Sequence, residues 1–215
     1  MAPMTSSRKP GAGKIVIISS PSGGGKTTIC RELLNAERRE QGWRFSISHT
    51  TRPPRVGEKD GREYHFVDDA TFDRMIEQGF FAEHFQVHEF KYGTPRRPLD
   101  EVREHGGVMV LDVDVNGAKA LKQEFPDAIT IFILPPSIAA LRERLQQRGT
   151  ETTEQMEMRF ENALREMRTF QSYGFEYVVV NKDLTVAVEE VLSVVIAHHC
   201  RLEHFPPEQL KNIVS

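Results

Sequence analysis

An apolar run, a glycine-rich segment and the beginning of a helical pattern follow one another at residues 14–34, KIVIISSPSGGGKTTICRELL. The run 15–18 does not alternate with polar residues, which is typical of a strand covered on both faces. Gly25, Lys26 and Thr27 satisfy the end of the pattern G-x-x-x-x-G-K-[ST], whereas Ser20 replaces its first glycine. Such a loop turns backbone N–H groups inward, and the next helix adds the positive end of its dipole. The order of elements therefore predicts an anion site between a strand and a helix.

The expected ligand of this loop is a nucleoside triphosphate with Mg²⁺. Lys26 would reach its β- and γ-phosphates, and the Thr27 hydroxyl would complete a magnesium shell with phosphate and water oxygens. The alternative is a glycine-rich turn with a surface lysine, but the flanking strand and amphipathic helix supply the context that the motif requires. The loop residues expected to bind the triphosphate are Ser20, Pro21, Ser22, Gly23, Gly24, Gly25, Lys26, Thr27 and Thr28.

Three more apolar runs, at 108–113, 129–134 and 177–180, resemble the first, and helical periodicity lies between and after them. Strands that alternate with helices predict an α/β fold with a mainly parallel, doubly wound sheet. Asp112 and Asp114 lie at the carboxyl end of the second run, where parallel sheets bind ligands. The sequence does not decide whether the Asp114 side chain faces the ligand cleft or caps the adjoining turn.

Residues 48–97 interrupt this rhythm and are interpreted as a lobe inserted into the core. In TTRPPRVGE, two prolines separate Arg52 from Arg55. On a polyproline II arm, with about 3.1 Å per residue, the two side chains would project from one face about 9 Å apart. With the Tyr64 and Tyr92 hydroxyls they could bind a second phosphate. A solvated basic loop with core tyrosines is the alternative.

Glu83 lies among phenylalanines in GFFAEHFQV and would need hydrogen-bond donors if it is buried. A guanine edge offers Glu83 two donors in bidentate geometry, and Ser48 could supplement this recognition of the base. An exposed glutamate on a strand explains the same pattern equally well.

A candidate lid follows at residues 140–160. Arg144 and Arg148 are spaced i, i+4 and therefore share a helix face, and Arg159 lies beyond a polar turn. Either these arginines are solvated and paired with the nearby glutamates, or they swing over bound phosphates when the turn moves.

The charge and composition narrow the classes of partner. A net charge of −3 and a pI near 6.3 argue against bulk binding to nucleic acid or to an anionic membrane. Two cysteines make neither a disulfide framework nor a zinc pattern, and no apolar run has membrane-spanning length. We expect a cytoplasmic protein with small-molecule substrates. The sequence leaves open whether the protein forms a homo-oligomer.

Seven segments together resemble the guanylate kinase family, from residue 14 to about 196. They are SSPSGGGKTT, SHTTRPPRVGEKDGREYHF, AEHFQVHEFKYGTP, LDVDVNG, IFILPPS, RGTETTEQMEMR and VVNKDL. The resemblance implies a P-loop core (14–47, 98–139 and 161–202), a GMP-binding lobe (48–97) and a small helical lid (140–160). Residues 1–13 would be a flexible N-terminal tail and 203–215 a C-terminal tail.

The resemblance also implies residue roles and a reaction, ATP + GMP ⇌ ADP + GDP with Mg²⁺, with dGMP as a further acceptor. Residues matching the family's GMP phosphate site are Arg52, Arg55, Tyr64 and Tyr92, and those matching its guanine site are Ser48, Glu83, Thr94 and Asp112. Lys26, Arg144, Arg148 and Arg159 match catalytic positions, and Asn181 matches a position near the adenine of ATP. A non-catalytic binding module of the same family, or a P-loop kinase with another acceptor, are the rival hypotheses.

The chain departs from the family's pattern at few positions. Ser20 and Gly24 vary the loop, Thr94 keeps a hydroxyl where other members have serine, and Lys182 stands where many have aspartate. None of these changes removes a charge that phosphoryl transfer requires, and Lys182 directly follows Asn181, the position that the resemblance places near adenine.

Overall fold

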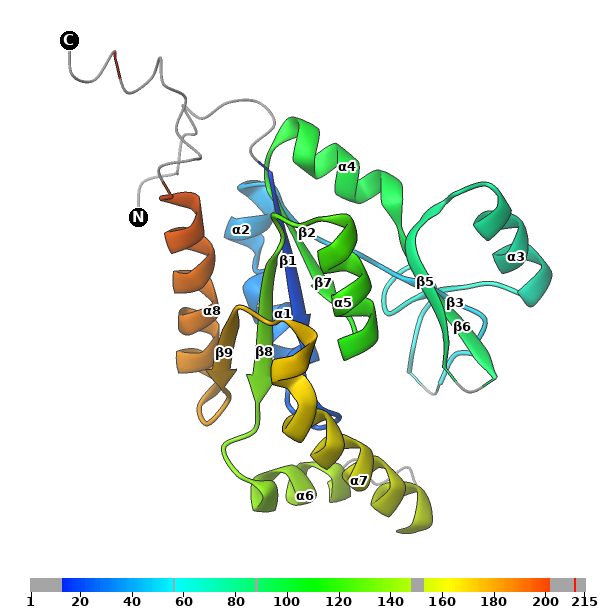
Figure 1. The fold of residues 1–215 in the computed structure, drawn as a ribbon, viewed down its shortest axis with the longest axis vertical. Helices are drawn as coiled ribbons and strands as arrows, with labels where there is room; N and C mark the ends of the chain where they lie inside the picture. The colour runs from blue at the N-terminus through cyan, green and yellow to red at the C-terminus, as the bar shows by residue number, and fades with distance from the viewer. Residues whose placement is uncertain (1–12, 56, 88, 148–152, 202–210, 212–215) are drawn as a thin grey trace.

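The computed structural model describes residues 13–55, 57–87, 89–147, 153–201 and 211 (Figure 1). Five parallel strands form the main sheet in the order β2-β7-β1-β8-β9. They are β1 (Lys14–Ser19), β2 (Trp43–Phe45), β7 (Val108–Asp112), β8 (Ile129–Leu134) and β9 (Tyr177–Val180). The predicted α/β fold with a parallel sheet is therefore confirmed. The carboxyl ends of β1, β8 and β9 point toward the end of the molecule where α6 and α7 lie (Figure 1).

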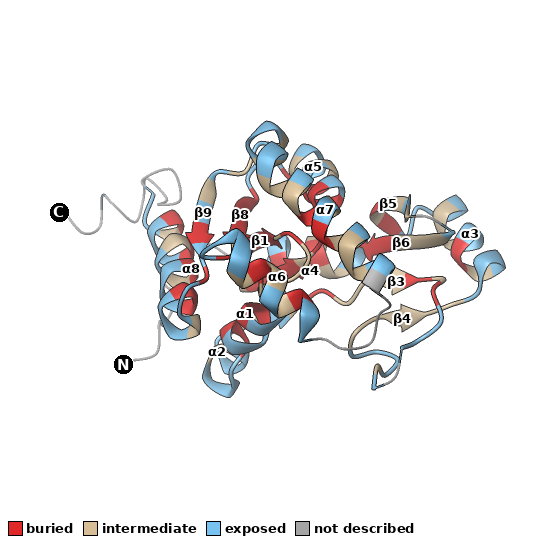
Figure 2. Cartoon of the chain, turned by 90° about the horizontal axis from the view of Figure 1, so that it is seen from below, coloured by how far each residue is buried: buried red, intermediate tan, exposed pale blue. Residues whose placement is uncertain are grey.

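Helices cover both faces of the main sheet, as its non-alternating apolar strands require. Val16 and Ile18 of β1 pack with α1 (Lys26–Leu33) and α8 (Leu184–His199), whereas Ile15 and Ile17 face the opposite cluster. That second cluster includes residues of α4 (Arg96–His105) and α5 (Val115–Glu124). Figure 2 shows the buried residues concentrated in these strands and on the inward sides of the helices.

Residues between the second and seventh strands form a separate sheet in the order β4-β3-β6-β5. Its strands are β3 (His49–Thr50), β4 (His65–Phe66), β5 (Phe81–Val87) and β6 (Phe90–Pro95), and α3 (Asp69–Glu77) precedes β5. Gly93 allows the close packing of this sheet, because a Cβ there would lie 2.7 Å from the Phe81 ring. The lobe stands beside α4 and α5 at the right of Figure 1.

A helical hairpin, α6 (Ile138–Gln146) and α7 (Thr153–Thr169), extends below the carboxyl ends of the strands (Figure 1). A short helical turn, η1 (Phe170–Tyr173), leads from α7 toward β9, and α2 (Ala36–Glu40) follows α1. Leu141, Leu145 and Phe160 form the apolar cluster of the hairpin. The Arg142 guanidinium lies 4.1 Å from the Phe160 ring centroid and 2.7 Å from Glu157, so the two helices form one unit.

Side-chain caps determine where several helices begin. Asp114 accepts a hydrogen bond from the Gly117 N–H (2.8 Å) and starts α5, while Ser137 and Asp183 start α6 and α8 in the same way. Of the two alternatives for Asp114, the structure therefore has the cap. Most residues of the two predicted tails lie outside the described residues.

Candidate active site

The glycine-rich loop joins β1 to α1 and closes on itself. The N–H of Gly24 and the hydroxyl of Ser20 both donate to the Pro21 carbonyl, at 2.9 and 3.0 Å. A Cβ on Gly24 would lie 2.8 Å from the Cβ of Ser20, so the serine at the first position fits because the fifth is glycine. Gly25 has a φ of +92°, in the left-handed region that favours glycine, and α1 begins at the next residue. The loop therefore opens onto a helix N-terminus, as the sequence predicts.

Asp112, at the end of β7, holds the two functional side chains that follow the loop. Its Oδ1 lies 2.6 Å from the Lys26 Nζ, and its Oδ2 accepts from the Thr27 hydroxyl at 3.0 Å. Lys26 also donates to the Val113 carbonyl at 2.6 Å. Burial lowers the pKa of Lys26, but the charge and hydrogen bond of Asp112 outweigh that effect, so this pKa is raised. The lysine is thus a permanent cation at neutral pH.

The donor atoms beside the loop fit a magnesium ion. Mg²⁺ prefers hard oxygen ligands, usually one or two from the protein with phosphate and water oxygens completing the octahedron. The Thr27 hydroxyl and the Asp112 carboxylate are 3.0 Å apart and both are such oxygens. The sequence predicted only Thr27 for this role. The structure adds Asp112 as a neighbour, although the resemblance places Asp112 in the guanine site.

Arg144 and Asn181 meet the loop from two other elements. The Arg144 guanidinium donates to the Asn181 carbonyl at 2.9 Å and to the Gly24 carbonyl at 3.4 Å. The Asn181 amide nitrogen donates to the same Gly24 carbonyl at 3.1 Å. Beside them lies a pocket of about 290 Å³, whose lining includes Thr28 and Lys182. Arg144 therefore lies where it can contact a ligand of the loop.

Helix α7 contacts the loop at Ser22. The Arg159 guanidinium donates to the Ser22 hydroxyl at 2.8 Å. Glu166 lies seven residues further along the helical face of Arg159, which is directed toward the loop. Burial raises the pKa of Glu166, and the charge of Asp114 adds to this shift. Arg148, the third predicted lid arginine, lies outside the described residues.

The arm of the inserted lobe orders Arg52 through an acidic partner. Arg52 is 7% exposed, and its Nη2 lies 3.0 Å from both carboxylate oxygens of Glu58. Glu58 also accepts from the backbone N–H of Arg55 at 2.7 Å, and the Arg55 side chain is exposed. One carboxylate therefore ties both arginine positions together. Glu58 was missed from the sequence, where only its place three residues after Arg55 could have indicated it.

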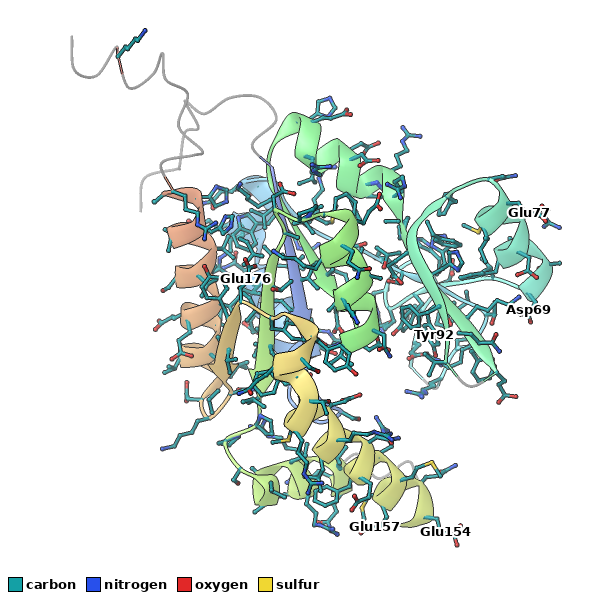
Figure 3. The ribbon with its side chains drawn as sticks, in the orientation of Figure 1. Asp69, Glu77, Tyr92, Glu154, Glu157 and Glu176 are labelled. Atoms are coloured by element: carbon teal, nitrogen blue, oxygen red, sulfur yellow. The ribbon has the colours of Figure 1, made fainter. Side chains whose placement is uncertain are left out.

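Tyr64 and Tyr92 stand next to this arm. Their rings contact edge to face at 5.9 Å, and the Arg52 guanidinium lies 5.6 Å from the Tyr64 ring. The Tyr92 ring also stacks on Phe85 at 6.1 Å. Figure 3 shows Tyr92 on the side of the lobe toward the main sheet. Burial raises the pKa of Tyr64, and the charge of Asp112 adds to the shift.

Glu83 is buried in the small sheet, 8% exposed. The Thr94 hydroxyl donates to its Oε1 at 2.5 Å, while its Oε2 is buried without a hydrogen-bond partner in the described part of the chain. Burial raises the pKa of Glu83 to about 7, against the opposing effect of Thr94, and the charge of Asp114 adds to the rise. The alternative of an exposed glutamate is wrong. Ser48 lies next to β3, and its carbonyl accepts from the His65 N–H.

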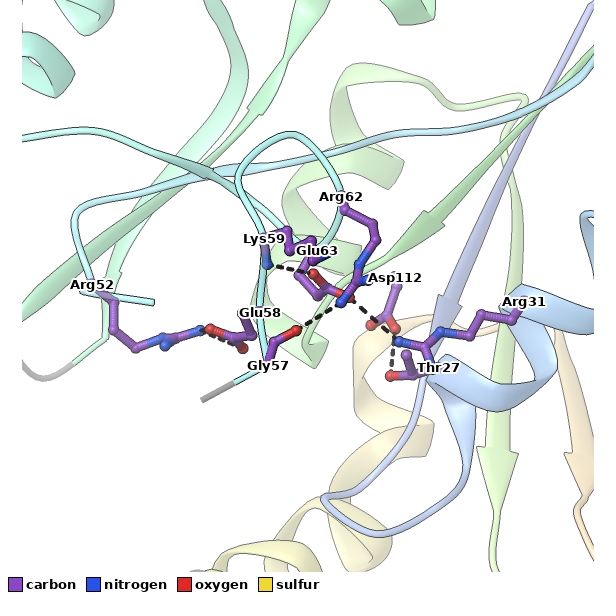
Figure 4. A network of polar contacts seen from close by, with 9 residues as sticks. All are labelled: Thr27, Arg31, Arg52, Gly57, Glu58, Lys59, Arg62, Glu63 and Asp112. Atoms are coloured by element: carbon purple, nitrogen blue, oxygen red, sulfur yellow. Dashed lines mark hydrogen bonds and ion pairs between the residues drawn. The ribbon is translucent and has the colours of Figure 1, made fainter. Parts of the chain in front are cut away.

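The two clusters approach each other across the boundary between core and lobe (Figure 4). Arg31 of α1 lies 3.6 Å from Glu63 of the lobe, and Glu63 also accepts from the Lys59 N–H and from Arg62. The same view shows Asp112 with Thr27 beside this contact. The structure therefore brings most of the predicted residues into two neighbouring clusters. Glu63 and Arg31 carry no motif that would have identified them.

None of the helices in the described part of the chain is long and apolar enough to cross a membrane.

The guanylate kinase family model matches residues 12–198. A guanylate kinase from Syntrophotalea carbinolica is 45% identical over 196 residues, 91% of each chain. One from Caldanaerobacter subterraneus subsp. tengcongensis is 42% identical over 191 residues, 89% of this chain and 90% of that protein. The crystal structure of guanylate kinase from Anaplasma phagocytophilum has a TM-score of 0.73 at 29% identity, covering 93% of this chain and 92% of that one.

Proposed function

The chain belongs to the guanylate kinase family and is a phosphotransferase that phosphorylates GMP, and we propose that it does so by in-line transfer from ATP with Mg²⁺. The observation that carries the proposal is that two clusters suited to phosphate groups are neighbours. One is a loop of backbone amides with Lys26, and the other is the arginine arm of the lobe, where Glu63 lies 3.6 Å from Arg31 of α1. Two phosphorylated ligands bound in these sites would face each other.

On the donor side, the loop from Ser20 to Thr28 cradles the ATP phosphates, and Lys26 neutralises the oxygen between the β- and γ-phosphates. Arg144, Arg148 and Arg159 stabilise the charge of the transferring group. Thr27, supported by Asp112, would hold Mg²⁺, which would supply further neutralisation of the phosphate charge. The predicted contacts of Asp112 with GMP and of Asn181 near adenine remain predictions.

On the acceptor side, Arg52, Arg55, Tyr64 and Tyr92 bind the GMP phosphate. The Oε2 of Glu83 has no partner within the described residues and is suited to the N1–H and N2–H₂ donors of guanine, with Thr94 beside it and Ser48 as a further contact. Adenine lacks this pair of donors on the corresponding edge. The burial of Glu83 therefore supports guanine over adenine, and dGMP shares the same base edge.

The main obstacle to transfer is electrostatic, because two polyanions must approach in line. The acceptor phosphate is already anionic, so no strong general base is needed. The cations on both sides offset the repulsion, and closure of lid and lobe would exclude water and limit hydrolysis of ATP.

The rival is a non-catalytic module that binds phosphorylated protein segments on the same lobe. Such a module has no use for Lys26, for its partner Asp112 or for Arg159 at the loop, all of which this chain retains. We further propose small nucleotides as the partners and the cytoplasm as the location, in keeping with the modest net charge of −3.

A coupled assay of ADP formation tests the proposal. Purified protein with ATP and Mg²⁺ is given GMP, dGMP, AMP, CMP or UMP as acceptor. GMP is expected to give the highest kcat/KM, with dGMP accepted and the other three at least about 100-fold poorer, because none of their bases offers two adjacent donors to Glu83. Turnover with AMP equal to that with GMP, or none with any acceptor, would refute it.

A further inference from the structure

Asn181 follows β9 directly, and its side chain turns back onto the glycine-rich loop. It is 6% exposed, and its backbone N–H donates to the Leu134 carbonyl at 2.8 Å. Its Nδ2 donates to the Gly24 carbonyl at 3.1 Å. Because that carbonyl can only accept, the atom facing it must be the amide nitrogen rather than Oδ1.

The amide also fills the space beside Gly25. A Cβ on Gly25 would lie 2.2 Å from Nδ2, so no side chain fits there while Asn181 keeps its position. Gly25 already needs glycine for its φ of +92°. The loop glycine and the asparagine are therefore complementary in shape as well as in hydrogen bonding.

Arg144 completes the arrangement from α6. Its guanidinium donates to the Asn181 backbone carbonyl at 2.9 Å and to the Gly24 carbonyl at 3.4 Å. The loop, the end of β9 and α6 thus meet at the Gly24 carbonyl. We call Gly24, Gly25, Arg144 and Asn181 the Gly24 node.

The geometry of the peptide bond gives this contact a consequence for phosphate binding. The C=O of Gly24 and the N–H of Gly25 belong to one planar trans peptide, so they point in opposite directions. When Asn181 and Arg144 hold the carbonyl on their side, the Gly25 N–H is held toward the opposite side, the interior of the loop. Such an N–H is one of the donors that a phosphate-binding loop must present. A glycine pair without this restraint could rotate the peptide.

We propose that Asn181 is a positioning residue for the triphosphate: it fixes the Gly24–Gly25 peptide so that its N–H faces the phosphates, and it helps to seat Arg144. The inference rests on the proposed ATP site. It differs from a contact with the adenine base, because it makes the contribution of Asn181 independent of the base.

Binding of a base-free probe separates the two roles. Mg²⁺-tripolyphosphate is titrated, as a competitor of ATP, against wild-type protein and the variants Asn181→Ala and Asn181→Asp. Positioning of the loop predicts that Asn181→Ala weakens tripolyphosphate and ATP by the same factor, about 10-fold or more. It also predicts that kcat falls while the KM for GMP stays within about 2-fold.

The aspartate variant makes the test sharper. It keeps the shape of asparagine but replaces the donating NH₂ by an oxygen that cannot donate to the Gly24 carbonyl. Asn181→Asp is therefore expected to be at least as impaired as Asn181→Ala. The proposal is overturned if tripolyphosphate binding is unchanged while ATP binding falls, or if Asn181→Asp binds as wild type does.

Hydrogen exchange in the nucleotide-free protein supplies a readout that does not depend on the proposed function. Amides of residues 22–25 should exchange faster in Asn181→Ala than in wild type, with the remaining core amides unchanged. Gln123→Ala removes an exposed amide side chain from α5 and serves as the control. Unchanged loop exchange in Asn181→Ala contradicts the inference, whereas wild-type protein that binds neither probe contradicts the proposed ATP site.

Discussion

At the scale of single residues, Glu83 links the acceptor site to pH. Its Oε2 is buried without a partner in the described part of the chain, and burial raises its pKa to about 7. A carboxylate in this state is costly to the folded protein when it is ionised. The same buried oxygen is available to accept hydrogen bonds from a ligand. The stability of the fold and the recognition of the ligand therefore place opposite demands on Glu83.

The first prediction concerns the stability cost of Glu83. An ordinary glutamate has a pKa near 4.5 and the folded value is about 7, so the folded state holds the proton more tightly. The protonated side chain therefore costs nothing below about pH 4.5, and the penalty grows to its full size as the pH rises through about 7, up to about 3 kcal/mol. Glu83→Gln should raise the free energy of unfolding at pH 8 but not at pH 4, as measured by urea denaturation. An equal change at both pH values would show that ionisation is not the cause.

The second prediction concerns proton release on binding. Guanine donors favour the ionised carboxylate, so GMP binding should lower the pKa of Glu83 and release protons near pH 7. Calorimetric titrations in phosphate and in Tris buffer should then give different apparent enthalpies. Because the GMP phosphate also titrates, Glu83→Gln is the control, and the difference between buffers should shrink in it. A difference that persists undiminished would assign the protons elsewhere.

At this scale the sequence identified residues that belong to motifs and missed those that only support them. Lys26, Arg52 and Glu83 were predicted from charge, spacing and apolar surroundings. Glu58 and Glu166 were not, because an exposed glutamate and a half-buried one look alike in a sequence. Asp112 was predicted to bind GMP, and the structure shows that it contacts Lys26 and Thr27. The sequence could not indicate these contacts, because β7 and α1 are far apart in the chain.

At the scale of elements, the arm between β3 and β4 is organised by one ion pair. Arg52 and Glu58 are both largely buried, with side chains 8% and 17% exposed. Breaking such a pair leaves an uncompensated charge, which is more costly than losing an exposed salt bridge. The arm therefore depends on Glu58 for the orientation of the cation that the GMP phosphate would meet.

The third prediction tests this dependence. Glu58→Ala should raise the KM for GMP by about 10- to 100-fold, with the KM for ATP unchanged, and Glu58→Gln should lie between it and wild type. Steady-state kinetics with each substrate varied in turn measure both constants. Glu77→Ala, on α3 at the outer side of the lobe (Figure 3), is the matched control and should behave as wild type. A lower KM for GMP in Glu58→Ala would mean that Glu58 instead competes with the phosphate.

The elements that the sequence predicted are those with continuous apolar runs. All four such runs are strands of the main sheet. The fifth strand, β2, was missed because it has only three residues and none of them is buried. In the lobe, β3 and β4 have two residues each, too few for any periodicity, and only their pairing with β6 and with each other defines them.

At the scale of the whole molecule, a parallel core and a separate small sheet place the two proposed phosphate sites at their boundary. In the network of Figure 4, Arg31 and Glu63 connect α1 to the lobe at 3.6 Å. Arg31 is 71% exposed, so this pair adds little to stability. The sequence predicted the parallel core and the inserted lobe, whereas the approach of the lobe to the loop depends on contacts between residues far apart in the chain.

Equilibrium titration of both nucleotides tests the central claim, that one chain holds two phosphorylated ligands in separate sites. Calorimetry with GMP, and with a non-hydrolysable ATP analogue and Mg²⁺, should give one of each per chain, each binding in the presence of the other. Lys26→Ala should lose the analogue and keep GMP, while Arg52→Ala should do the reverse. Competition between GMP and the analogue for a single site, or loss of both by either substitution with the fold intact, would contradict the account.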